Sequence, residues 1–149
     1  MSIRYTYIEG LPDNHILEEV FTLLSNVFTI PLDEEYFKSI YTRKNILICL
    51  CYSEQEIIGC KIGYEVHETI YYSWLGGTSE SYRNMGIGSA LMDMQHNWCR
   101  KKGYTSIRTK TLDSNVQMQS LNHTYNFSKI SFEQSDLYGI KILSEKSLI

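Results

Sequence analysis

The spacing of apolar and polar residues predicts alternating strands and helices along this chain. Residues 3–8 alternate as in a strand, and an apolar stripe at helical spacing follows Asp13 and Asn14, either of which can cap a helix. Pro31 stops this helix, and Asp33 can cap a short second one. The residues expected to face inward are Leu17, Val20, Phe21, Leu24, Val27 and Phe28 in the first helix and Tyr36, Phe37 and Ile40 in the second.

Three runs rich in β-branched and aromatic residues predict a meander of strands over 46–52, 57–66 and 70–75. Gly59 and Gly63 are expected to break the second of these strands. Apolar residues at helical spacing predict that the next element is a helix; they are Ile87, Ala90, Leu91, Met94 and Trp98. Its predicted end combines cations at the negative pole of the helix with a glycine in the stop position.

The C-terminal part of the chain predicts one strand, one helix and two closing strands. These elements are a strand at 106–111, a helix from about Asn115 to Tyr125 after a cap at Asp113 or Ser114, and strands at 130–133 and 137–143. The complete order predicts an α+β fold on a mixed sheet. A chain of 149 residues suits a single domain, expected to span 1–149.

Composition narrows the classes of protein and partner. The net charge of −3 argues against broad binding of nucleic acid, and the longest apolar run, 46–52, is too short to cross a membrane. Residues 1–5 lack the apolar segment of a signal peptide, so a cytoplasmic location is expected. The four cysteines lack the spacing of a metal site, and we expect buried free thiols; they are Cys49, Cys51, Cys60 and Cys99.

Residues 78–92 combine the end of a strand, a short turn with the pattern Arg-x-x-Gly-x-Gly and the start of a helix. Gly86 and Gly88 allow close approach of a ligand, and the free N–H groups of the first helical turn suit an anion such as phosphate. A Walker loop is excluded because Ser89 does not continue the Gly-Lys-Ser/Thr pattern, and a Rossmann fingerprint is excluded because Leu91 is not small. The alternative is that the two glycines form only a turn.

Two motifs in this order resemble those of the GNAT superfamily of N-acetyltransferases, and the resemblance covers nearly the whole chain. The first motif is the Arg/Gln-x-x-Gly-x-Gly/Ala loop, and the second is Asn-x-x-(Ala/Met)-x-x-Leu after the fifth strand. The matching residues are Arg83, Gly86 and Gly88 for the first and Asn115, Met118 and Leu121 for the second. Residues 72–77 and 95–98 are similar to a bacterial subgroup. The resemblance implies a mostly antiparallel sheet of six to seven strands with about four helices.

The resemblance also implies acetyl-coenzyme A (acetyl-CoA) as co-substrate and direct attack of an amine on its thioester. The pyrophosphate would lie on N–H groups of residues 84–89, and the pantetheine arm would pair with Gly76 and Thr78 as an added strand. Gly76 and Gly77 would leave room for that approach. The residues expected to bind the cofactor are Gly76, Thr78, Arg83, Asn84, Met85, Gly86, Ile87, Gly88, Ser89 and Asn115.

The chain departs from the family's pattern at the group that assists the leaving thiolate. Asn122 stands where the family often has a tyrosine, and an amide cannot deliver a proton at neutral pH. Tyr125, one helical turn further on, can take this role, or it can simply pack beside Met118 and Leu121. Asn126 replaces a glycine of the family and suits a left-handed helix end.

The acceptor amine needs a base and a pocket, and the sequence leaves alternatives open for both. Glu65, near the end of the third strand, can accept a proton directly or through water, or it can be a solvated strand-end residue. The histidines His67, His96 and His123 are weaker candidates, because one lies in a turn and two lie on helices. Tyr72 and Trp74 share a face of the fourth strand, where they line the acceptor pocket or fill the core.

The sequence therefore predicts an acetyl-CoA-dependent N-acetyltransferase that acts on a primary amine of a small molecule, peptide or protein in a ternary complex. One alternative is an acyl-CoA sensor with little or no turnover, which Asn122 leaves open. Another is a structural domain with an empty loop. Binding of the cofactor would distinguish the structural domain from the enzyme and the sensor. Turnover would distinguish the enzyme from the sensor. No nucleic-acid, membrane or metal partner is expected, and a homodimer is left open.

Overall fold

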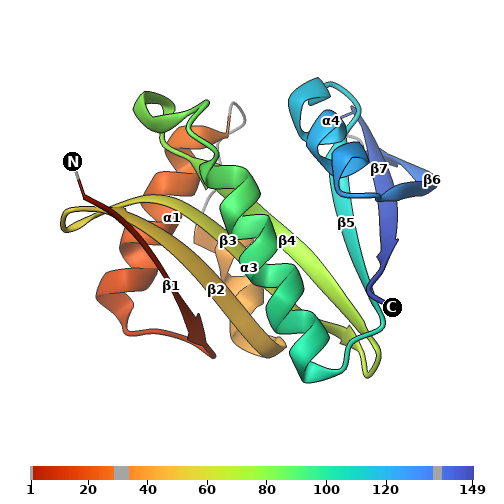
Figure 1. Ribbon diagram of the computed structural model, residues 1–149, viewed down its shortest axis with the longest axis horizontal. Coiled ribbons are helices and arrows are strands. Elements are labelled where there is room, and N and C mark those ends of the chain that lie inside the picture. The colour runs from red at the N-terminus through yellow and green to blue at the C-terminus, as the bar shows by residue number, and fades with distance from the viewer. Residues whose placement is uncertain (1, 29–33, 136–138) are drawn as a thin grey trace.

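A computed structural model describes residues 2–28, 34–135 and 139–149, and its seven strands form one sheet (Figure 1). The strands are β1 (Ile3–Glu9), β2 (Lys44–Ser53), β3 (Glu56–His67), β4 (Ile70–Thr78), β5 (Ser106–Leu112), β6 (Ser128–Ser135) and β7 (Gly139–Ser147). The helices are α1 (Asn14–Val27), α2 (Glu34–Phe37), α3 (Ile87–Lys102) and α4 (Val116–Thr124), with short 3-10 segments η1 (Lys38–Thr42) and η2 (Glu80–Tyr82). The expected α+β fold is confirmed.

The strand order in the sheet is β1-β2-β3-β4-β5-β7-β6. Every neighbouring pair is antiparallel except β4 and β5, which run parallel and are joined by α3 as the crossover helix. The expectation of a mixed, mostly antiparallel sheet is therefore correct. Within the described residues, no helix is long and apolar enough to cross a membrane.

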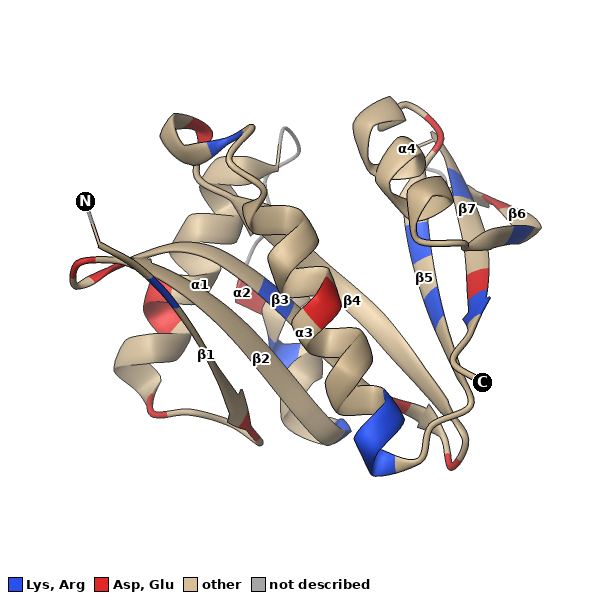
Figure 2. Cartoon of the chain, in the orientation of Figure 1, with Lys and Arg blue, Asp and Glu red and all other residues tan. Residues whose placement is uncertain are grey.

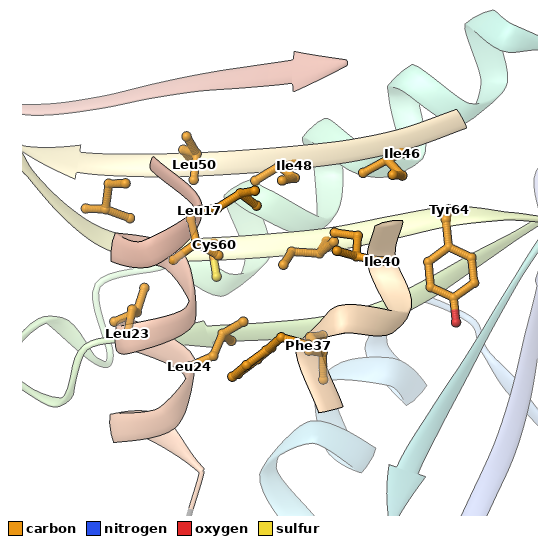
Figure 3. Close-up of a cluster of buried hydrophobic side chains, with 14 residues drawn as sticks. Leu17, Leu23, Leu24, Phe37, Ile40, Ile46, Ile48, Leu50, Cys60 and Tyr64 are labelled. Atoms are coloured by element: carbon orange, nitrogen blue, oxygen red, sulfur yellow. The ribbon is translucent and has the colours of Figure 1, made fainter. Parts of the chain in front are cut away.

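Helices cover both faces of the sheet, with α1 and α2 on one face and α3 and α4 on the other (Figure 1). Asp13 caps α1 by accepting a hydrogen bond from the Ile16 N–H at 3.0 Å. The predicted apolar stripe faces the sheet, with Leu17, Val20 and Leu24 buried. Figure 3 shows Leu17 and Leu24 pointing from α1 toward the sheet, where α1 lies over β3 and β4. Burial of this stripe fixes α1 on the sheet, as the helical spacing predicted.

Two clusters of buried apolar residues contain the cysteines. One lies between α1 and the sheet, and the other lies between α3 and the sheet. Cys49, Cys51 and Cys99 belong to the cluster under α3, whereas Cys60 belongs to the cluster on the α1 side. All four are free and buried, which confirms the expectation of buried free thiols. Burial raises the pKa of Cys49 and of Cys60 to about 12.

Three glycines of β3 and β4 allow neighbouring helices and side chains to pack closely against these strands. Their roles differ in part from those predicted. β3 runs unbroken through Gly59 and Gly63, because Gly59 lies directly beneath α3 and a side chain on Gly63 would overlap the Tyr71 ring. A β-carbon on Gly77 would lie 2.8 Å from Val27 Cγ1. Gly77 therefore admits α1, rather than giving room to a cofactor as predicted.

The ends of several elements also differ from the prediction. Asn115 is the N-cap of α4, in place of the predicted Asp113 or Ser114, and its Oδ1 accepts a hydrogen bond from the Met118 N–H at 3.1 Å. β6 is longer than predicted, and β7 extends to Ser147. The predicted stop at Pro31, the predicted cap at Asp33 and the predicted start of the last strand at Leu137 lie outside the described residues.

Candidate active site

The parallel strands β4 and β5 pair over only the first part of their length. Their pairing stops at Ser73 and Thr109, and the Thr109 hydroxyl donates to the Ser73 carbonyl at 3.1 Å. Beyond this point, residues 74–78 of β4 and 110–112 of β5 have no pairing with each other. We call this opening the splayed edge, and it exposes the backbone of β4 on the side that faces β5.

A β-bulge in β4 marks the point where the strands diverge. Ile62 and Gly63 are adjacent in β3, and their partners in β4 are Leu75 and Ser73. Trp74 is therefore one extra residue in β4. A bulge bends its strand and increases the local twist, so it helps to turn β4 away from β5.

Two residues of β4 direct their backbone polar groups toward the splayed edge. The N–H of Ser79 donates to a carbonyl of β3 at 2.7 Å. Because successive strand residues point their N–H and C=O groups to opposite sides, Gly77 faces β3, and Gly76 and Thr78 face the splayed edge. The Arg83 Nε donates to the Thr78 carbonyl at 3.4 Å, which agrees with this direction. The geometry thus puts Gly76 and Thr78 on the side where an added strand would pair.

The loop between β4 and α3 presents a series of open N–H groups. Asn84 and Gly86 have positive φ angles of 65° and 77°, and Gly86 is the N-cap of α3. Within the described residues, no N–H of residues 84–89 donates to a backbone carbonyl, and no side chain caps α3. An open helix N-terminus of this kind attracts anions through its N–H groups and its dipole.

Both glycines of this loop have open space beside them. A β-carbon built on Gly86 would meet nothing within 4 Å, and one on Gly88 would meet only Leu121 Cδ2, at 3.9 Å. Both positions therefore open onto free space next to unpaired N–H groups. Residues 84–89 can hold the pyrophosphate of CoA, and Gly76 and Thr78 can pair with its amide groups.

Asn122 and Tyr125, the residues considered for the leaving thiolate, are both engaged in contacts of α4. Asn122 is 5% exposed, and its Nδ2 donates to the Thr111 hydroxyl of β5 at 3.0 Å. The Tyr125 hydroxyl donates to the Ser89 carbonyl of α3 at 3.0 Å. Burial, with Asp93 adding to it, raises the pKa of Tyr125. The Tyr125 hydroxyl thus links α4 to α3, and the ring packs against the core.

Glu65 lies apart from the splayed edge. It pairs with Tyr71 near the start of β4, and its carboxylate accepts hydrogen bonds from the Tyr104 hydroxyl at 2.8 Å and from the Asn45 amide at 3.1 Å. Glu65, Tyr104 and Asn45 line a pocket of about 600 Å³ beside the C-terminal end of α3. Figure 2 shows that the cations of α3 gather at this end, which is opposite to the loop. The structure therefore does not bring Glu65 to the predicted cofactor site.

Tyr72 and Trp74 share a face of the sheet, as predicted, and belong to a group of rings that we call the aromatic cluster. The ring centroids of Tyr36 and Trp74 are 5.7 Å apart, and those of Tyr64 and Tyr72 are 5.4 Å apart. The Arg43 guanidinium lies 4.7 Å from the Tyr64 ring centroid. Tyr72 and Trp74 are partly buried against the core under α1 and α2. They therefore fill the core and also present a surface beside the β-bulge.

Glu133 of β6 is a candidate that the sequence did not reveal. Burial, then Tyr64 and Tyr36, then the charge of the Glu133 carboxylate raise the pKa of Tyr72, a member of the aromatic cluster. Lys110 of β5 forms an ion pair with Glu133 at 3.1 Å. The sequence of β6 does not reveal these interactions of Glu133, because the alternation of residues in a strand does not determine the order of the strands in the sheet.

His96 belongs to the core, in agreement with the weaker status that the sequence gave it. It is 2% exposed, and its Nδ1 lies 3.0 Å from the Lys146 Nζ. Burial, together with Lys146, lowers the pKa of His96 to about 3, so the ring is neutral at physiological pH. His67 and His123 are exposed; His123 lies on α4, whereas His67 is the last residue of β3 and not in the turn as predicted.

Comparison with known proteins adds family information to this geometry. The model of the acetyltransferase (GNAT) family matches residues 17–126, whereas no curated protein sequence matches the chain. The ribosomal-protein-S18-alanine N-acetyltransferase from Escherichia coli has a TM-score of 0.83 at 15% identity, over 97% of this chain and 94% of that chain. A GNAT family acetyltransferase from Elizabethkingia anophelis with acetyl-CoA bound has a TM-score of 0.76 at 18% identity, over 96% and 97%. Naa50 from Arabidopsis thaliana, in complex with the bisubstrate analogue CoA-Ac-MVNAL, has a TM-score of 0.77 at 18% identity, over 99% of both chains.

At these identities the solved structures establish a shared fold, and the family match covers most of the chain. On this evidence the chain belongs to the GNAT family of acetyltransferases.

Proposed function

We propose that the protein transfers an acetyl group from acetyl-CoA to a primary amine, by direct attack within a ternary complex. The observation that carries this proposal is the splayed edge with the open N–H groups of residues 84–89 at its end. A strand edge next to a helix N-terminus offers one partner for the amide groups of a pantetheine arm and another for its phosphates.

Each part of the cofactor is assigned to particular residues of the chain. The loop N–H groups of residues 84–89 hold the pyrophosphate, and Arg83 fixes the start of the loop through the Thr78 carbonyl. Gly76 and Thr78 pair with the arm along the splayed edge. Asn115 uses its Oδ1 as the α4 cap, so its amide N–H groups are the part that can donate to the cofactor.

The acceptor amine approaches from the face that carries the aromatic cluster. Tyr72 and Trp74 border the β-bulge on this face, and an ammonium ion is attracted to the faces of such rings. The amine must lose a proton before it attacks, because a lysine-like amine has a pKa near 10.4. We take Glu133 as the group that accepts this proton, directly or through water, because its charge acts on Tyr72 of the aromatic cluster, whereas Glu65 lies beside the C-terminal end of α3.

The thiolate of CoA leaves without a tyrosine acid at Asn122. The Asn122 amide donates a hydrogen bond to Thr111, so this side chain acts by steadying the site rather than by giving a proton. The acceptor is a small-molecule, peptide or protein amine. Buried free cysteines suit a reducing compartment, and we place the reaction in the cytoplasm.

Two measurements on the purified protein test this function. Acetyl-CoA should raise the melting temperature, since binding at a hundredfold excess over Kd adds about 2.7 kcal/mol to stability. A panel of amines and peptides, analysed by mass spectrometry, should reveal at least one acetylated product. The absence of both a thermal shift and calorimetric heat at millimolar acetyl-CoA would refute the proposal. Binding without transfer to any amine or peptide would favour the sensor alternative, which Asn122 in place of a tyrosine leaves open.

A further inference from the structure

The buried side-chain atoms that lack a hydrogen-bond partner gather at one place on α3. In the part of the chain that the structure describes, these atoms are Nε2 and Oε1 of Gln95 and Nε2 of His96. Gln95 is 0% exposed and His96 is 2% exposed. The neutral His96 ring uses Nδ1 to accept from the Lys146 Nζ, so its Nε2 carries the hydrogen. Because buried polar groups are almost always hydrogen-bonded, this place can receive a polar group from outside the chain.

Lys61 of β3 faces α3 beside these two residues. It pairs with Cys49, which belongs to the core cluster under α3, and Gly63, two residues further along β3, faces the same way. A β-carbon on Gly63 would lie 2.9 Å from Gln95 Nε2. The charge of Lys61 also acts on His96 and contributes to the lowering of its pKa. We call Lys61, Gln95 and His96 the buried polar cluster.

The Lys61 amine is buried without an anion beside it. It is 8% exposed, and none of the ion pairs found among the described residues includes it. The titratable groups that interact with it are Cys49 of β2, Cys60 of β3 and His96 of α3. All three are neutral at physiological pH, because the pKa of each of these cysteines is about 12 and that of His96 is about 3. A lysine is rarely buried unless it is paired, so this amine suits an anion that arrives with a ligand.

The buried polar cluster borders the splayed edge on the face that carries α3. Lys61 pairs with Gly76, and its Cγ lies 3.5 Å from the position of a β-carbon on Gly76, so the missing side chain leaves room for the lysine. Gln95 lies against Gly63, whose partner Ser73 is the last residue of β4 that pairs with β5. The aromatic cluster packs on the opposite face, under α1 and α2.

We propose that Lys61 receives the sulfur atom of CoA and donates a proton to it as the thiolate leaves. Under the proposed function, on which this role of Lys61 rests, the phosphates lie at the start of α3 and the acceptor amine arrives on the opposite face. The sulfur is then on the α3 side of the splayed edge, where Lys61 lies. Gln95 and His96 add N–H donors to the same cluster, and these also favour an anion. Lys61 thus supplies the proton donor that Asn122 cannot be.

The proton transfer balances without another reactant. The amine nitrogen bonds to the carbonyl carbon, the C–S bond breaks, and the electron pair of that bond stays on sulfur. The Lys61 ammonium gives one proton to the sulfur and becomes a neutral amine, while Glu133 takes one proton from the attacking amine. Exchange with water returns both side chains to their starting states. Burial lowers the pKa of Lys61 toward that of a thiol, and such a match makes proton transfer efficient.

Ionisation of the CoA thiol in the complex tests this role without an acceptor amine. Ultraviolet absorbance of the thiolate is followed over the neutral pH range in the complex of the full chain with CoA. The complex with desulfo-CoA, which lacks the sulfur, is the blank. The pKa of the bound thiol should fall to about 7.5 or lower, from an ordinary value near 8.5. The thiols of the protein do not interfere, because burial raises the pKa of all four.

Lys61→Met keeps the length of the side chain and removes the amine. The variant should return the bound thiol to its ordinary pKa and should lower kcat by about a hundredfold with any acceptor that the wild type acetylates. Its thermal shift with acetyl-CoA should be kept. Lys101→Met, on the exposed end of α3, is the matched control and should behave as the wild type does.

Three results would overturn the role of Lys61. They are an ordinary pKa of the bound thiol in the wild type, a lowered pKa that persists in Lys61→Met, and an acetyl group found on Lys61 by mass spectrometry after incubation with acetyl-CoA, which would make this amine an acceptor. Failure of both CoA and desulfo-CoA to bind would instead refute the proposed cofactor site. Circular dichroism checks the fold of each variant, and the wild-type titration decides the question even if Lys61→Met does not fold.

Discussion

The second glycine of the loop offers the sharpest test, because stability and cofactor binding should respond to its substitution with opposite signs. Gly88 is the second residue of α3 and has ordinary helical geometry, unlike Gly86. Alanine is favoured over glycine in a helix by about 0.8–1.0 kcal/mol, and the added methyl group would only touch Leu121 at 3.9 Å. Gly88→Ala should therefore stabilise the free protein by about 0.5–1 kcal/mol, a rise of roughly 1–4 °C in melting temperature.

The same methyl group enters the space where residues 84–89 would hold the pyrophosphate. A tenfold loss of affinity corresponds to about 1.4 kcal/mol. At a cofactor concentration of a hundred times the wild-type Kd, the stabilisation by acetyl-CoA should fall from about 2.7 to about 1.4 kcal/mol. Differential scanning calorimetry with and without acetyl-CoA measures both effects on the same sample.

Two further glycine variants provide matched controls at the opposite ends of α3. Gly86 and Gly103 both have positive φ angles, 77° and 92°, and a β-carbon at either would meet nothing within 4 Å. Substitution by alanine should destabilise both to a similar degree, about 1–2 kcal/mol, through backbone strain alone. Only Gly86→Ala should also reduce the acetyl-CoA shift. If Gly88→Ala and Gly86→Ala kept the full shift, the loop would be only a turn and the proposed cofactor site would be wrong.

Three other perturbations test the roles of single side chains. Tyr125→Phe removes the hydrogen bond to the Ser89 carbonyl, so stability should fall by about 1 kcal/mol while turnover stays within tenfold of wild type; a larger loss of turnover would make Tyr125 the acid. Glu133→Gln should lower kcat/KM at neutral pH by about a hundredfold, with the loss shrinking at high pH, whereas Glu65→Gln should leave the pH–rate profile unchanged; the reverse pattern would restore Glu65 as the base. His96 has a pKa of about 3 in the folded protein, below its ordinary value near 6.5, so the unfolded state binds more protons between these values. Its contribution to stability should be complete above pH about 6.5 and decline as the pH falls, and urea unfolding at several pH values should show a flatter decline for His96→Gln.

The fold and the backbone conformation of the loop before α3 could be predicted because local patterns specify them. The apolar stripe of α1, the strand runs and the glycines of the loop each depend on neighbours within a few residues, and all three are found as expected. Asn126 also adopts the predicted left-handed conformation, with φ of 69°. Such features follow from propensity and spacing, without knowledge of the tertiary arrangement.

The positions of the candidate catalytic side chains could not be predicted, because they depend on strand order and on the direction of each side chain. Glu65 stands at a strand end in the sequence, but the antiparallel pairing with β4 carries it away from the splayed edge. In the sequence, Glu133 cannot be distinguished from other exposed strand residues. In the structure, β7 lies between β5 and β6, and Glu133 forms an ion pair with Lys110. The cap of α4 was missed for a more local reason, since Asp113, Ser114 and Asn115 are all good capping residues.

The short pairing between β4 and β5 has a consequence for the cooperativity of the molecule. Only four residue pairs join β4 to β5, fewer than any other neighbouring pair of strands, so the hydrogen-bond ladder is weakest there, although the core cluster under α3 spans both sides. Backbone amides at Gly76 and Thr78 should exchange with solvent far faster in the free protein than those in the centre of β3. A ligand that pairs with this edge would complete the hydrogen-bond ladder across the gap. This junction of the sheet would then be stiffer when the protein is loaded, and the co-substrate would serve as a temporary part of the sheet.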